Sequence, residues 1–231
     1  KPKLKSLAMA VTAAFSVKKL VDFGRQSIET ASDLAEVQNV VDTAFGESKQ
    51  KMEEFADTAV KTYGISKLTA KQTGSNFMAM AAGMGLVNDS ASDMAMALTG
   101  LSADMSSFYN VGQDVASTAL KSIFTGETET LKQFGIVMTD ANLQAYALSK
   151  GITKSTADMS QAEKVQLRYN YVMSQTALAQ GDFAKTSDSW ANQTRILSEQ
   201  WKEFGATIGT VLMNVLLPAV KAINSLLSQL I

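Results

Sequence analysis

Proline is almost absent from this chain, and its scarcity constrains the fold more than any other feature of the sequence. Only Pro2 and Pro218 occur among the 231 residues. Because proline breaks the interior of a helix, a chain with so few prolines can form long helices. Strand patterns are lacking: Phe108–Val111 is too short for a strand, and Gly135–Thr139 could form only a brief extended connector. The sequence therefore predicts an all-α fold.

Glycines divide the middle of the chain into short segments with helical periodicity. A glycine often ends a helix, and glycines follow such segments at positions 46, 64, 83, 85, 112, 126, 135, 151 and 181. We therefore expect a compact bundle of short helices over residues 47–186. A long amphipathic helix is expected in residues 1–46, from about Leu4 to Ala44. Another is expected in residues 187–231, beginning near Ser187 and bent or broken at Pro218.

Two local patterns predict where helices begin. Ser160 and Glu163 have the spacing of a capping box, in which each side chain accepts a hydrogen bond from the other residue's backbone N–H. They predict a helix that runs to about Ala179. Ser90 and Asp93 resemble a capping box with Asp in place of Glu. Both patterns place a helix start inside the expected bundle.

The segment from residue 101 to residue 147 contains the densest series of residues that end or begin helices. An apolar run stops at Gly126, two acidic residues follow, and a second apolar pair stops at Gly135. This order predicts a helix end, a short helix whose first turn carries the negative charge that its dipole favours, and a second helix end. A β-branched residue at position 126 should disrupt the turn if φ is positive there. The predicted structural turn comprises Gly126, Glu127, Glu129, Leu131, Phe134 and Gly135.

Apolar residues in the expected carboxy-terminal helix recur at alternating spacings of three and four, as in helices that pair along a coiled-coil seam. The seam shifts by one residue near Leu212. An intramolecular core helix and a self-associating bundle both fit this pattern. A membrane span fits less well, because the uncharged stretch Gly205–Val220 has 16 residues, fewer than the roughly 20 that a span needs; an interfacial or tip-inserting segment is a further alternative. The predicted helix–helix interface comprises Trp190, Leu197, Trp201, Phe204, Ile208, Leu212, Leu216, Ile223, Leu226 and Leu230.

The composition argues against several classes of chemistry. The chain has no histidine and no cysteine, so it lacks the usual zinc ligands, the commonest general base and the thiol nucleophile, and it cannot form a disulfide. Its net charge of −1 gives no reason to expect a specific nucleic acid as partner. Glu127 and Glu129 could suggest acid–base chemistry, but a helix dipole already explains them. We expect no enzymatic activity, no cofactor and no metal site.

Four segments of the chain share their order and spacing with one protein family. Besides residues 101–147, they are DLAEVQNVVDTAFG at 33–46, YGISKLTAKQTGSNFMAMAAGMGL at 63–86 and QGDFAKTSDSWANQTRILSEQWKEFGATIG at 180–209. Together these segments resemble phage tail tape measure proteins, in particular the group named after lactococcal siphophages. The resemblance covers about Ser32 to Gly209, and we expect the chain to be an internal fragment of a longer polypeptide.

The resemblance implies a structural protein of the virion, made in the host cytoplasm, that lies in the lumen or tip of the tail tube. Such a protein is long and helical, sets tail length during tail assembly, and is released at genome ejection to assist DNA passage. Its implied partners are further copies of itself as a trimer or hexamer, the tail tube protein, distal tail or baseplate hub proteins, and the host membrane during ejection. Contractile tails and phage-tail-like bacteriocins carry relatives. A non-viral helical coiled-coil adaptor is the alternative that the helical pattern leaves open.

Overall fold

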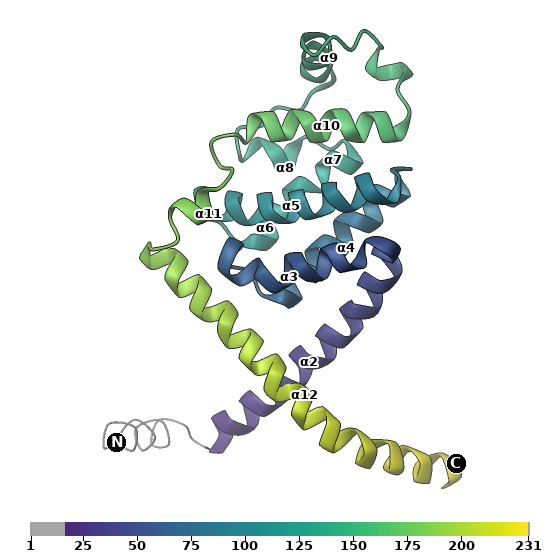
Figure 1. Ribbon diagram of the computed structural model, residues 1–231, viewed down its shortest axis with the longest axis vertical. Helices are drawn as coiled ribbons and strands as arrows, with labels where there is room; N and C mark the ends of the chain where they lie inside the picture. Colours follow the sequence, from purple (N-terminus) through teal and green to yellow (C-terminus); the bar gives the residue numbers. More distant parts are fainter. Residues whose placement is uncertain (1–16, 231) are drawn as a thin grey trace. The chain divides into compact units, whose positions relative to one another are not determined.

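The computed structural model describes residues 17–230, apart from a few side chains near the two ends, and Figure 1 shows their helical arrangement. No strand occurs among these residues, so the predicted all-α class is confirmed. The first helix described, α2, covers Val17–Phe45 and ends at the predicted glycine, Gly46. The part of the predicted first helix that precedes residue 17 lies outside the described residues.

The described residues form two compact units. The bundle unit comprises residues 37–199, and the two-helix unit comprises residues 17–36 and 200–230. The division falls inside α2 and inside the last helix, α12, which covers Trp190–Leu230. Each of these helices therefore contributes residues to both units. The domain boundaries predicted from the sequence lie elsewhere: the one after residue 46 lies at the end of α2, and the one after residue 186 lies shortly before the start of α12.

The bundle unit consists mainly of short helices that follow one another along the chain (Figure 1). Helices α4 and α5 pack against each other most extensively, while α3 packs on α4 and α6 packs on α5. The core between them is apolar, and Phe45, Phe77 and Phe124 are among its largest fully buried side chains. Burial of such side chains supplies most of the free energy that holds short helices together. The elements are η1 Gly46–Ser48, α3 Lys49–Tyr63, α4 Lys67–Gly83, α5 Asn88–Phe108, α6 Gln113–Leu120, α7 Ser122–Thr125, α8 Glu129–Lys132, α9 Asp140–Ser149, η2 Thr156–Asp158, α10 Gln161–Gln175 and α11 Asp182–Lys185.

Several helices of the bundle unit end at the predicted glycines. At Gly64, a left-handed conformation with φ of 64° ends α3. A Cβ atom at this position would also overlap the ring of the fully buried Phe183. Glycine is therefore required at position 64 both for the backbone angle and for the close approach. Positive φ angles also occur at Gly46, Gly85, Gly126, Gly135, Gly151 and Gly181.

The capping box predicted at Ser90 and Asp93 is wrong. Helix α5 begins earlier, at Asn88, so that Ser90 lies inside the helix. The Nδ2 atom of Asn88 donates a hydrogen bond to the carbonyl oxygen of Phe45 (3.1 Å), and the carboxylate of Asp93 pairs with Lys51 (3.3 Å). Contacts with α2 and α3 therefore accompany the earlier start of α5, and no pattern within the segment itself predicts them.

The capping box predicted at Ser160 and Glu163 is confirmed at the start of α10. The Ser160 hydroxyl oxygen accepts a hydrogen bond from the Glu163 N–H (3.3 Å), and the Glu163 carboxylate accepts one from the Ser160 N–H (2.7 Å). The helix is shorter than predicted, because it ends at Gln175 instead of continuing to about Ala179. The side chain of Gln180 folds back to donate to the Met173 carbonyl (2.7 Å), which satisfies one of the last carbonyls of the helix.

Acidification should weaken this cap. The pKa of Glu163 is lowered to about 2, first by the hydrogen bond from Lys154 and then by that from the Ser160 N–H. Because the folded-state pKa lies below the ordinary value of 4.5, the carboxylate stabilises the fold above that value, and this contribution is lost as the pH falls toward 2. NMR titration should give a Glu163 midpoint near 2, and a higher one in Lys154→Met. Equal midpoints in the two proteins would contradict the assignment to Lys154.

The carboxy-terminal helix begins a few residues later than predicted. Helix α12 starts at Trp190 rather than near Ser187, because the Ser189 hydroxyl oxygen caps it by accepting a hydrogen bond from the Asn192 N–H (3.2 Å). The helix is not broken at Pro218 but continues to Leu230. A proline inside a helix lacks the N–H that would bond the carbonyl one turn earlier, so this position is a weak point of the backbone ladder.

Candidate functional site

The predicted turn at Gly126 joins two helices of only four residues each. Gly126 ends α7 in a left-handed conformation with φ of 80°, and its N–H donates to the Ser122 carbonyl (2.8 Å). Glu127 precedes α8, whereas Glu129 lies in the first turn of that helix and pairs with Lys132 (2.6 Å). Of the two acidic residues, only Glu129 therefore occupies the position that a helix dipole favours.

The apolar residues of the turn are part of the core. Leu131 and Phe134 are buried, and the Phe134 ring lies edge-on to Tyr109 with ring centres 5.0 Å apart. The Tyr109 hydroxyl donates to the Phe134 carbonyl oxygen (3.1 Å). Gly135 follows with φ of 74° and open space beside it. These contacts give the turn a structural role, which is to place α7 and α8 against the core.

Arg168 on α10 belongs to the same turn, although no sequence pattern links it to Gly126. Its Nη1 atom donates to the carbonyl oxygen of Phe124 (3.3 Å) and lies at the limit of hydrogen-bond distance from that of Ile123 (3.5 Å). A Cβ atom on Gly126 would lie 2.7 Å from the Arg168 Nη2 atom. Burial lowers the pKa of the Arg168 guanidinium, and the charge of Asp140 opposes this effect. The cation thus caps the carbonyl end of α7, where a positive charge is favourable.

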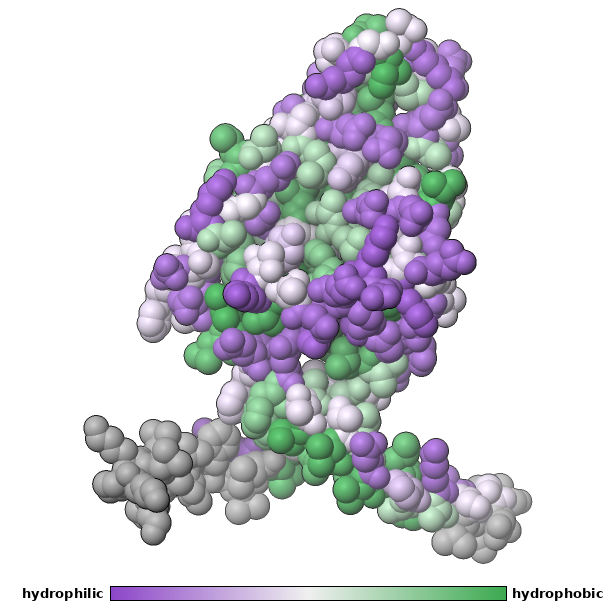
Figure 2. Space-filling view, in the orientation of Figure 1, coloured by the Kyte–Doolittle hydropathy of each residue, from purple (hydrophilic) through white to green (hydrophobic). Residues whose placement is uncertain are grey.

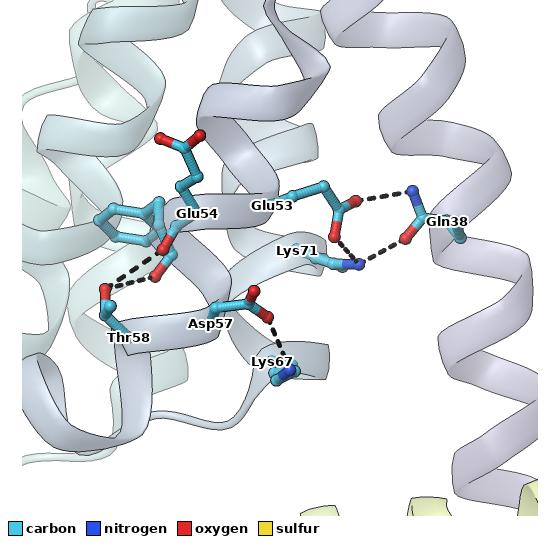
Figure 3. Close-up of polar contacts among 8 residues, drawn as sticks. Gln38, Glu53, Glu54, Asp57, Thr58, Lys67 and Lys71 are labelled. Atoms are coloured by element: carbon cyan, nitrogen blue, oxygen red, sulfur yellow. Dashed lines mark hydrogen bonds and ion pairs between the residues drawn. The ribbon is translucent and has the colours of Figure 1, made fainter.

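A second polar cluster, shown in Figure 3, ties α2, α3 and α4 together. The Lys71 ammonium group pairs with the Glu53 carboxylate (2.7 Å) and donates to the Gln38 side-chain oxygen. The Gln38 amide nitrogen in turn donates to Glu53 (2.7 Å). Only 8% of the Lys71 side chain is exposed, against 37% for Glu53. The three side chains satisfy one another, as a buried charge requires.

A third polar contact fixes the segment that leads into α11. The buried carboxylate of Asp104 accepts hydrogen bonds from the N–H groups of Gly181 (2.7 Å) and Phe183 (3.2 Å). Burial raises the pKa of Asp104, and these two N–H groups partly offset the rise. No pattern in the sequence indicates this contact, because Asp104 lies 77 positions from Gly181.

In the two-helix unit, α2 and α12 approach each other closely at small residues. Gly205 and Gly209 of α12 face α2, and a Cβ atom on Gly209 would overlap the carbonyl oxygen of Ser27 and lie 2.9 Å from the Ala31 Cβ atom. Beside this contact, the Trp201 ring lies 5.6 Å from the Phe23 ring, measured between centres. Two glycines four residues apart thus allow the two helix backbones to come into contact.

Most of the predicted interface residues on α12 with described side chains are exposed, and Figure 2 shows apolar surface along the carboxy-terminal part of α12. Trp190 is 84% exposed and Leu197 is 64% exposed. Trp201, Phe204, Leu216 and Ile223 are each about half exposed, whereas Ile208 and Leu212 are partly buried. The side chains of Leu226 and Leu230 lie outside the described residues. This apolar face is the candidate functional site of the chain.

The α12 helix also meets a simple criterion for a membrane span. By length and composition, the stretch Trp190–Ser225 is apolar enough to cross a bilayer, and 11% of its most apolar window is buried. Core helices of soluble proteins meet the same criterion of length and composition. Among residues 17–230, no three acidic side chains gather in a way that could hold a metal ion.

No family model, curated protein or solved structure matches the chain.

Proposed function

We propose that this chain is a structural component of a phage tail or phage-tail-like particle, namely part of a tape measure protein. It sets tail length from the tube lumen or tip and is released at infection to assist DNA passage. The observation that carries this proposal is the resemblance of four segments, in the same order and spacing, across residues 32–209. The parent protein is made in the host cytoplasm and becomes part of the virion tail.

The geometry of the long helices supports this proposal. At about 1.5 Å per residue, a helix of 41 residues such as α12 extends about 60 Å, and one of 29 residues such as α2 extends about 45 Å. Helices of this length suit a protein that lies along a tube. The bundle unit, with its glycine-ended short helices, would be a compact module within that protein.

The proposed partners are further copies of this chain, as a trimer or hexamer, the tail tube protein and the distal tail or baseplate hub proteins. The exposed apolar face of α12 supports contacts of this kind, because monomeric proteins rarely leave a large contiguous apolar surface in water. The host membrane is the proposed contact during ejection. The proposal includes no enzymatic step and no specific nucleic acid.

The direct test is quantitative mass spectrometry of purified tail particles from the source strain. We expect a few copies of this chain per particle, far fewer than the tube protein, together with peptides that extend beyond both ends of the 231 residues. The ratio to the tube protein distinguishes three copies from six. Absence from tails, or a copy number near that of the tube protein, would contradict the proposal and favour the helical coiled-coil adaptor.

A further inference from the structure

A small pocket lies between α9, the η2 turn and α10, at one end of the bundle unit (Figure 1). Its volume is about 240 Å³. Sites for drug-sized ligands have volumes of roughly 300–1,000 Å³, so this pocket suits a ligand of only a few heavy atoms. Leu143, Ala157 and Leu167 form the apolar part of its lining.

Two cations line the pocket without a carboxylate partner. Lys164 and Arg168 lie four positions apart on α10, so they share a face of the helix and repel each other. Among the residues that the structure describes, neither side chain forms an ion pair. Arg168 is partly buried, and it donates to a neutral carbonyl oxygen, that of Phe124. An anion in the pocket would relieve the repulsion and give the buried charge a counter-ion.

Asp140 limits the charge that such an anion can carry. It lines the same pocket from the first turn of α9, and its charge acts on Arg168 although the two do not form an ion pair. Two cations and one carboxylate leave one net positive charge, which a monoanion balances. A phosphate monoester carries about −1.5 to −2 at pH 7, so it would leave excess negative charge beside Asp140.

The wall opposite α10 is held in place by the protein itself. The Thr156 N–H donates to the side-chain oxygen of Gln144 (2.8 Å), which ties η2 to α9. Lys154 pairs with Glu163 (2.8 Å), which ties the same loop to the start of α10. Because the loop is already ordered, a ligand need not supply the free energy to order it, and even a small ligand can bind measurably.

We propose that this pocket binds a carboxylate carried on a small apolar body. The Lys164 ammonium group is the direct partner of the carboxylate, and Arg168 supplies the second positive charge. The apolar lining contacts the body of the ligand. A short-chain carboxylic acid and the carboxyl-terminal residue of a peptide share this chemistry. The inference uses only the charges and walls of the pocket, so it does not depend on the proposed function.

NMR titration of the full chain with N-acetylalanine tests the proposal, and N-acetylalaninamide, which lacks the negative charge, is the matched control ligand. We expect saturable shifts of the Thr156 and Ala157 N–H signals with the acid, with a Kd on the order of 1 mM, and no saturable shift with the amide. A longer peptide that ends in alanine distinguishes the two sources. Tighter binding of the peptide indicates a chain end, and equal binding indicates a free acid.

Two substitutions should change the affinity in opposite directions. Lys164→Met should weaken binding of N-acetylalanine by about tenfold or more, because it removes a charged hydrogen-bond donor. Lys61→Met, at an exposed lysine of α3, should leave it unchanged. Asp140→Asn should tighten binding by about threefold, because it removes a repelling charge. A purely structural role of Asp140 predicts no such gain, and unchanged signals from the core show that each variant is folded.

Three results would overturn the proposal: equal shifts from the acid and the amide, an unchanged affinity of Lys164→Met, or tighter binding of methyl phosphate than of N-acetylalanine. Absence of any saturable shift below about 10 mM would do the same. The copy number in tail particles does not enter these measurements, so this proposal and the proposed function fail separately.

Discussion

Replacing Glu53 with alanine should lower the free energy of unfolding by about 3 kcal/mol, because it leaves the Lys71 ammonium group buried without its carboxylate. The Lys71 side chain is 8% exposed, so its ammonium group is poorly hydrated and depends on protein partners. The Gln38 side-chain oxygen, a neutral acceptor, would remain as its hydrogen-bond partner. Urea denaturation followed by circular dichroism measures this loss, and for a protein of this size it corresponds to a fall in Tm of about 6–12 °C.

Substitution of the other member of the ion pair is the matched control. Lys71→Met removes the buried charge and fills the same space with an apolar chain, and 37% of the Glu53 side chain is already exposed to water. We therefore expect a change within about 1 kcal/mol, since the buried charge is gone and the Glu53 carboxylate keeps water and the Gln38 amide nitrogen as partners. Equal losses for Glu53→Ala and Lys71→Met would show that burial of the lysine is not the cause.

Replacing Gly126 with valine should destabilise the bundle unit by about 3 kcal/mol. A left-handed conformation, with φ of 80° here, costs a residue with a side chain about 1–2 kcal/mol and is least accessible to β-branched residues. The new Cβ atom would also displace Arg168, which donates to the Phe124 carbonyl, and the loss of this partly buried contact adds about 1 kcal/mol. Thermal unfolding monitored by circular dichroism tests this expectation.

Gly135→Val separates the two causes. Gly135 has a similar φ of 74°, but nothing lies within 4 Å of the place where its Cβ atom would be, so its substitution introduces backbone strain alone. We expect roughly half the loss found at Gly126. If both substitutions lowered Tm equally, the contact of Gly126 with Arg168 would contribute nothing to stability. Unchanged melting of Gly126→Val would contradict the whole description of the turn.

Features set by neighbours in the sequence could be predicted, because their causes are local. The capping box at Ser160 and Glu163 depends on two side chains three residues apart, and the glycine at position 64 ends α3 through its own backbone angle. The all-α class follows from the same local patterns. Predicting these features requires no knowledge of which helices pack against each other.

Features set by distant residues could not be predicted. Asn88 begins α5 with a contact to Phe45, Lys71 pairs with Glu53 and Gln38, and Arg168 reaches the turn more than 40 positions away. A polar side chain gives no sign in the sequence of a partner that far along the chain. The division into two units is hidden for a similar reason, because it falls inside two continuous helices and not at a loop or a glycine.

The close contact between Gly209 and Ser27 has a consequence for the order of folding. These residues are about 180 positions apart, so forming their contact from an unfolded chain would close a very long loop, at a large loss of chain entropy. The bundle unit between them is held largely by helices adjacent in sequence, which meet early because their loops are short. We expect the bundle unit to fold first, leaving only residues 17–36 of α2 and 200–230 of α12 to find each other. The crossing of these helices would then form last, and it would be the first part of the native structure to open.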